Sequence, residues 1–317
     1  MKNLWQRLAI SLASVTVIAV NFYPSAGLAS DPFRNGSGRN IGFNTESAFK
    51  SVFEKGNYPE AKKYLDLAEK TEPNEPMVYA LRGSLAYLDE DWTTLKTYAE
   101  QTISKSQKLT NKDSLRGNLY TAVGYFLKGA ADFQKEGAIG AVKNLQKVLE
   151  YLDIAEKIDS KDPELNLIKG YMELMIATRM PFANVNDAVN NLEKYGQPKY
   201  LAMRGIALGY RDLKKYDKAA NYADNLIKIM PQNPDAQHLK AQILLNQKKY
   251  VEAKKMYKKA LEKSAIMPKK TVAQIVFEYC VSNERIDKKD YNCSIYFREV
   301  VANPGSWGPS KLPSIIK

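Results

Sequence analysis

From residue 45 onward, the chain carries apolar residues at helical spacing, interrupted by Pro, Asn and Gly. Apolar side chains that recur every three or four residues occupy one face of a helix. No long segment alternates between apolar and polar residues with a period of two, which is the pattern of a half-buried strand. The sequence therefore predicts an all-α fold.

Part of this pattern repeats at a fixed distance. Residues 214–219 (KKYDKA) align with residues 248–253 (KKYVEA) at an offset of 34. A third copy near the start of the pattern keeps the same internal spacings of apolar residues and proline: Tyr58, Ala61, Leu65, Ala68 and Pro73. Alanine lets a neighbouring helix approach closely, and proline ends one helix and begins the next. The repeats therefore predict short, tightly packed helices.

These segments resemble the tetratricopeptide-repeat (TPR) family, whose units of about 34 residues form two antiparallel helices. The resemblance implies a superhelical solenoid, because a helix pair buries its apolar face only against neighbouring pairs. We expect about six repeats over residues 45–267. Their predicted starts lie near residues 42, 76, 110, 163, 200 and 234. The third repeat is enlarged, at 110–162, and predicts a longer hairpin with helices at 112–135 and 138–158.

The first 29 residues have the pattern of a cleaved signal peptide. Lys2 and Arg7 precede an apolar run at 8–20, and small residues lie just before Ser30. The alternative is an uncleaved anchor, but a membrane span needs roughly 20 apolar residues and this run is shorter. No later segment is apolar enough to be a transmembrane helix. We therefore expect residues 1–29 to direct export to the periplasm or the exterior.

The remaining segments flank the repeats. Residues 30–44 are rich in Gly, Asn and Ser and predict a flexible linker. Residues 268–317 predict a capping helix, at about 269–283, and a less regular tail. Export makes a disulfide between Cys280 and Cys293 chemically reasonable, and it would pin the tail to this helix. Two free thiols are the alternative.

The charge of the chain bears on its partners. The formal net charge is +12, which favours acidic or anionic partners. Nine lysines concentrate at 248–270, against Glu252 and Glu262. These lysines are either a solvated outer face or a contact for anionic envelope polymer or lipid. Nucleic acid is not expected for an exported chain, and no aromatic platform accompanies the lysines.

Catalytic and metal-binding motifs are lacking in the sequence. His238 is the single histidine, and no Cys or carboxylate cluster with metal-ligand spacing accompanies it. It is either a polar residue of a helix or a pH-sensitive contact. No phosphate-binding loop and no Gly-x-Ser-x-Gly motif occurs. We therefore expect no metal, no cofactor and no enzymatic activity, although an active site of scattered residues stays open as an alternative.

The TPR resemblance also implies which residues line the concave surface, since fixed positions of each first helix face it. Some of these residues could instead pack against neighbouring helices. The expected groove is apolar and aromatic in its middle and suits a protein or peptide partner. Export signal, repeats and basic charge together resemble exported TPR proteins of cyanobacteria, so we expect a protein-interaction scaffold of the cell envelope. The expected groove residues are Met77, Ser84, Tyr87, Leu167, Tyr171, Leu174, Leu201, Arg204, Arg211 and His238.

Overall fold

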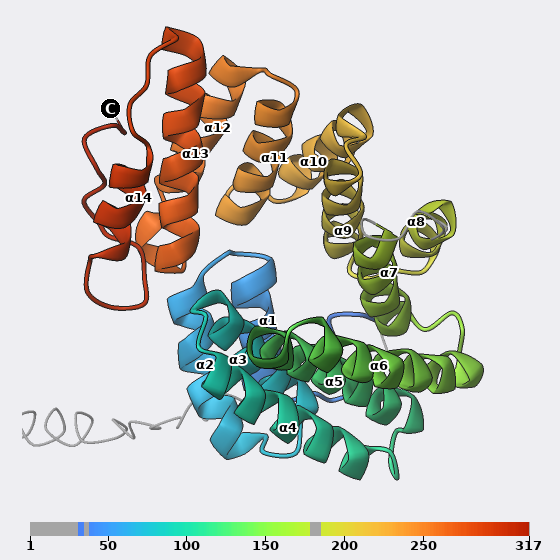
Figure 1. Ribbon diagram of the computed structural model, residues 1–317. Coiled ribbons are helices and arrows are strands. Elements are labelled where there is room, and N and C mark those ends of the chain that lie inside the picture. The colour runs from blue at the N-terminus through green and yellow to red at the C-terminus, as the bar shows by residue number, and fades with distance from the viewer. Residues whose placement is uncertain (1–30, 35–37, 178–184, 317) are drawn as a thin grey trace, which may run out of the picture.

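The computed structural model describes residues 31–34, 38–177 and 185–316, and the predicted signal peptide lies outside them. Within these residues the fold is all-α, with fourteen α-helices that pack in consecutive pairs (Figure 1). No helix in this part of the chain combines the length and the apolar character needed to cross a bilayer. The pairs are α1 (Phe43–Phe53) with α2 (Tyr58–Thr71), α3 (Pro76–Leu88) with α4 (Trp92–Leu109), α5 (Ser114–Glu136) with α6 (Ala138–Ile158), α7 (Pro163–Ala177) with α8 (Val185–Lys194), α9 (Lys199–Asp212) with α10 (Tyr216–Ile229), and α11 (Pro234–Asn246) with α12 (Tyr250–Leu261), followed by α13 (Lys269–Asp287) and α14 (Ser294–Val301).

The array of helix pairs follows the predicted repeats. The first helices of the six pairs begin within four residues of the expected starts. The enlarged third unit forms a long hairpin, with 23 residues in α5 and 21 in α6.

Side-chain caps fix where several helices begin. The side chains of Asn57, Asp91, Asp113 and Asn233 each accept a hydrogen bond from the backbone N–H three residues later. Such a cap satisfies one of the amides that the first turn of a helix leaves without a partner. These polar residues therefore set the repeat boundaries from local sequence alone.

The turns inside four helix pairs share one backbone conformation. Gly56, Glu90, Lys214 and Lys248 all have positive φ, between 56° and 63°. Glu90 follows Gly56 by 34 residues, and Lys248 follows Lys214 by the same distance. Only glycine adopts this conformation without steric cost, so the other three turns hold it against a local penalty.

The array curls until its first pairs meet its last ones (Figure 1). The Tyr58 hydroxyl donates to Asp235 Oδ2 at 2.7 Å. Asn233 Nδ2 donates to the carbonyl oxygens of Phe53 and Glu54, at 3.2 and 3.0 Å. Lys270, at the start of α13, pairs with Glu90 at 2.6 Å. We call these contacts the closure; they join the first part of the array to its last part.

The segment before α1 differs from the flexible linker expected at 30–44. Phe33 and Ile41 are buried, with 4% and 2% of their surfaces exposed. Arg34 forms ion pairs with Asp162 and Glu164, near the start of α7. A composition rich in small and polar residues suggests flexibility, but here the array supplies partners for the charged and aromatic side chains.

A buried ion cluster joins this segment to three helices. Glu164 is fully buried and lies 3.3 Å from Arg116 Nε, and the Tyr120 hydroxyl donates to it at 2.7 Å. Arg116 also pairs with Glu75 at 2.7 Å. Buried charges are tolerated when several hydrogen bonds satisfy them, as they do here. The cluster fixes α3, α5 and α7 relative to one another.

The C-terminal region folds back onto the array. Cys280 and Cys293 form a disulfide that links α13 to the start of α14. Within the tail, which was expected to be less regular, residues 294–301 form the helix α14. Beyond it, Gly308 N–H donates to the Met267 carbonyl at 2.9 Å, and Trp307 packs beside Val52 and Tyr58. The tail therefore covers the end of the array and also contributes to the closure.

Candidate binding cavity

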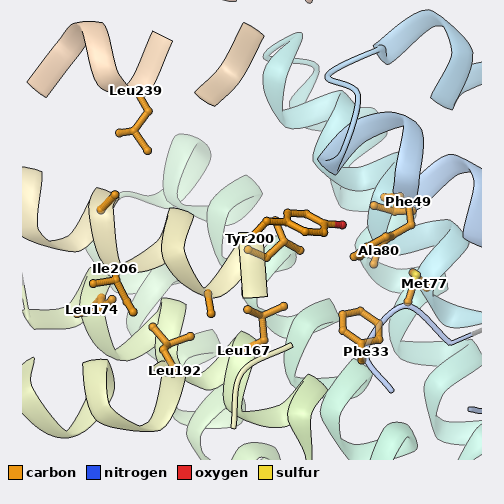
Figure 2. Close-up of a cluster of buried hydrophobic side chains, with 14 of the residues drawn as sticks. Phe33, Phe49, Met77, Ala80, Leu167, Leu174, Leu192, Tyr200, Ile206 and Leu239 are labelled. Carbon is orange, nitrogen blue, oxygen red and sulfur yellow. The ribbon is translucent and has the colours of Figure 1, made fainter. Parts of the chain in front are cut away.

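A cavity of about 480 Å³ lies on the inner side of the array. Its walls come from the segment before α1 and from α1, α3, α5, α7 and α9. Figure 2 shows Phe33, Phe49, Met77 and Ala80 gathered near Leu167 of α7. The volume falls within the range of about 300–1,000 Å³ that is typical of pockets for small ligands.

The walls follow from helical periodicity. Leu167, Tyr171 and Leu174 recur at spacings of four and three on α7, so they share one face. At the other wall, the rings of Phe33 and Phe49 pack edge to face with centroids 5.2 Å apart. Gly205 lets α9 approach α7 closely, because a Cβ there would lie 2.5 Å from the Tyr171 ring.

Seven of the ten expected groove residues line this cavity. They come from three different helix pairs, so the folded array brings together positions that lie more than a hundred residues apart in the sequence. Six of the seven are buried or half-buried, and Ser84 is the exposed one. The seven are Met77, Ser84, Leu167, Tyr171, Leu174, Leu201 and Arg204.

Arg204 is the one basic residue among the described residues that line the cavity. Burial works against its charge, but neighbouring Tyr171 and Asp235 outweigh this and raise the pKa of the guanidinium. Among the described residues no carboxylate forms an ion pair with it, and Asp235 instead accepts from Tyr58. The cavity therefore has a largely apolar wall with one cationic group, Arg204, and one exposed carboxylate, Asp212.

Two of the expected residues, Arg211 and His238, belong to a polar network beside the cavity. Its centre is Glu278 of α13, whose Oε2 lies 2.7 Å from His238 Nε2. Gln242 Nε2 donates to Glu278 Oε1 at 3.0 Å, and Arg211 donates to Gln242. Burial opposes the ionisation of Glu278, but hydrogen bonds from His238, Gln274 and Gln242 outweigh it and lower its pKa.

Tyr87, the remaining expected residue, lies away from the cavity. Half of its surface is exposed, and its ring packs edge to face against Trp92 at 5.7 Å. It lies near the end of α3, where the helix continues past the cavity wall. Tyr87 is therefore not among the residues that line the cavity.

Two important residues escaped the sequence analysis. Phe33 lines the cavity from a segment expected to be a linker, and only its isolated aromatic character could have pointed to it. Glu278 lies on α13 between Ile275 and Tyr279, which are both fully buried. An acidic residue beside such residues is a weak signal for a buried polar contact.

The basic face of residues 248–270 is partly used within the protein. Lys254 lies over the Tyr279 ring at 5.4 Å, and Lys270 pairs with Glu90. Lys263 and Lys269 donate to backbone carbonyls at 2.8 and 2.6 Å. The exposed lysines in this range are Lys248, Lys249, Lys255, Lys258 and Lys259. The surface available to an anionic partner is therefore smaller than the sequence suggested.

The last two helix pairs, whose sequences are offset by 34 residues, contain a segment that matches a known repeat family. Residues 210–265 match the tetratricopeptide repeat family. The match covers the end of α9, the helices α10 and α11, and α12. No curated protein matches the sequence. The matched segment is thus similar to a type of repeat whose members bind protein partners.

A comparison with solved structures finds similar helical proteins. One is the crystal structure of PilW, described as a widely conserved type IV pilus biogenesis factor; it is 12% identical, with a TM-score of 0.46, over 72% of this chain and 93% of that one. Another is a tetratricopeptide repeat protein from Parabacteroides merdae, at 15% identity and a TM-score of 0.42, over 81% and 96%. A TPR protein from Thermus thermophilus is 14% identical, with a TM-score of 0.29, over 82% and 98%.

Proposed function

We propose that this protein is an exported, non-enzymatic scaffold of the cell envelope that holds a partner protein at the inner cavity of its TPR-like array. The observation that carries the proposal is the cavity of about 480 Å³, walled by apolar side chains from five helices and holding Arg204. Burying apolar groups of a partner in such a space is favourable because they leave water. Arg204 adds an attraction for an acidic group of the partner.

Export is supported by two independent features. The sequence at 1–29 has the pattern of a signal peptide. The disulfide between Cys280 and Cys293 fits an oxidising compartment. Protein recovered from the cell envelope should therefore begin near Ser30 when its N-terminus is sequenced, and an intact leader in that fraction would refute export by cleavage.

Partner binding is best tested by filling the cavity. Ser84 is exposed on the cavity wall, and its hydroxyl bonds only to the Ala80 carbonyl of its own helix, at 3.0 Å. A tryptophan there fills the space without displacing a packed side chain. Proteins crosslinked to the wild type in cells should be lost from Ser84→Trp when the purified complexes are analysed by mass spectrometry.

Thr97→Trp is the matched control. Thr97 is also exposed, and its hydroxyl likewise bonds to the carbonyl four residues earlier, at 3.1 Å, but it lies on α4 outside the cavity. It should retain the wild-type partners. Equal capture by both variants would show that the cavity is not the binding surface.

The alternative is that exposed lysines bind an anionic polymer or lipid of the envelope. Lys255→Glu combined with Lys259→Glu reverses two charges on the outer face of α12. If this double variant loses the partners and Ser84→Trp keeps them, the basic face is the working surface.

A further inference from the structure

The polar side chains on the cavity wall are already hydrogen-bonded within the protein. The Tyr171 hydroxyl donates to the Leu201 carbonyl at 2.7 Å, and the Tyr120 hydroxyl donates to Glu164. Ser84 bonds to its own helix, and Asp212 accepts from Arg211 Nε at 2.7 Å. The fifth polar side chain among the described lining residues is Arg204, which hydrogen-bonds to the Tyr171 side chain and is attracted by Asp235 but forms no ion pair with a described carboxylate. A guanidinium has five N–H donors, so donors remain for a ligand.

Because most polar side chains of the wall are already hydrogen-bonded, the cavity favours ligands that need few hydrogen bonds. A peptide segment carries an N–H and a C=O group at every residue, and burying them without hydrogen bonds is unfavourable. The cavity walls are helical, so their backbone amides and carbonyls are largely committed to the helices. An unbranched hydrocarbon chain has no such groups, and each methylene that leaves water favours binding.

The closure also disfavours a peptide as the ligand of the cavity. Tyr58 with Asp235, and Asn233 with the carbonyls of Phe53 and Glu54, join the two ends of the array. A peptide that ran along the inside of the whole array would need to pass these contacts. A narrow chain that enters from one side and ends inside would not.

We infer that the cavity binds an unbranched acyl chain whose polar end carries an anionic group, with the chain against Leu167 and Leu174 and the anion at Arg204. The inference rests on the proposed function only in taking the same cavity as the working site. It names the group that enters: a free fatty acid, or the acyl chain of a lipid-modified partner that has an acidic residue near its attachment point. A guanidinium without an ion-pair partner is a strong complement for a carboxylate.

The test is calorimetric titration of the full exported chain with sodium dodecanoate. Saturable binding to one site is expected. Arg204→Met should weaken it about tenfold, because the charge-assisted hydrogen bonds are lost, and Arg204→Lys should recover part of the loss. Dodecanol, which lacks the carboxylate, should bind the wild type more weakly than dodecanoate does. It should bind Arg204→Met and the wild type with equal affinity. Arg285→Met, on the exposed side of α13, is the control for removing an arginine.

Two further arms identify the source and exclude surface binding. N-dodecanoyl-Gly-Asp-amide represents a lipid-modified partner, and its acetyl counterpart should not bind. Ser84→Trp should abolish the binding of both acyl probes, whereas Thr97→Trp should leave it unchanged. Absence of saturable binding by either acyl probe, or binding that survives Ser84→Trp, would overturn the inference.

The outcomes also separate this inference from the proposed function. If Ser84→Trp loses the crosslinked partners but neither acyl probe binds the wild type, the protein-binding role stands and the acyl ligand is refuted. If an acyl probe binds in the cavity while Ser84→Trp keeps its crosslinked partners, the acyl ligand stands and the protein-binding role of the cavity is refuted.

Discussion

Arg204 and His238 occupy the same position in successive repeats, 34 residues apart, yet their surroundings differ. Arg204 faces the apolar cavity and has no ion-pair partner among the described residues. His238 lies 2.7 Å from Glu278, which also accepts hydrogen bonds from Gln242 and Gln274. The inner surface therefore has two parts. The part with Arg204, which we call the hollow half, borders the cavity. In the part with His238, which we call the bonded half, the polar side chains hydrogen-bond to one another.

The difference comes from what lies across from each helix. The helix α13 packs directly behind the sixth pair and supplies Glu278 to its inner face. The inner face of α9 instead looks toward α1 and α3, which the curvature of the array holds at a distance. Whether an inner side chain is free to bind a ligand is therefore decided by the element that lies across from it. The repeat to which the side chain belongs does not decide it.

The largest expected effect is the loss of Glu278. Glu278→Ala leaves His238, Gln242 and Gln274 without their shared acceptor in a nearly buried site, which should cost about 3 kcal/mol of unfolding free energy. Urea denaturation measures it. The exposed Glu262→Ala should change stability by less than about 0.5 kcal/mol. Equal losses of unfolding free energy in the two variants would show that the hydrogen bonds of Glu278 do not stabilise the fold.

The same contrast should depend on pH. The pKa of Glu278 is lowered in the folded protein, so the folded state binds fewer protons than the unfolded one as the carboxylate titrates. Its contribution is present above the unfolded value of about 4.3 and is lost as pH falls through the folded value. The difference in melting temperature between wild type and Glu278→Ala should therefore narrow below about pH 4.3. A constant difference down to pH 3 would count against an ionised Glu278.

A smaller effect is expected at the closure. Gly56 has positive φ, and a Cβ there would lie 2.7 Å from Pro234 Cδ. Gly56→Ala should cost about 1–2 kcal/mol and loosen the contact between the first and sixth pairs. Lys248→Ala has the same backbone conformation and already carries a Cβ, so it should be nearly neutral. Hydrogen exchange near Asn233 reports the loosening, and unchanged exchange in Gly56→Ala would argue against the closure.

The smallest expected effect concerns the hollow half. Arg204→Met removes a half-buried charge that has no ion-pair partner among the described residues, so stability should change by less than about 0.5 kcal/mol or rise slightly. Urea denaturation alongside Glu278→Ala makes the comparison direct. A loss as large as that of Glu278→Ala would mean that Arg204 is structural and not available to a ligand.

The features that the sequence predicted are local ones. The helix pairs, including the long hairpin α5–α6, follow from apolar spacing and from caps such as Asp91 and Asp113, which act within a few residues. The cavity residues on α7 and α9 were also predicted, because inner positions recur in every repeat.

The features that escaped prediction depend on distant contacts. Arg34 meets Asp162 across 128 residues, and Tyr58 meets Asp235 across 177. No local pattern marks either pair, so the burial of Phe33 and the closure could not be inferred. Tyr87 has the spacing of an inner position, but it lies where α3 has passed the cavity wall.

The central claim is that the inner side of the curled array holds an apolar cavity that a ligand can enter. A crystal of the wild-type protein under xenon pressure tests this directly, because xenon occupies apolar cavities. The account predicts xenon density between Phe49 of α1 and Leu174 of α7, and none there in Ser84→Trp. A wild-type crystal in which these walls touch, or in which xenon avoids the space between them, would contradict it.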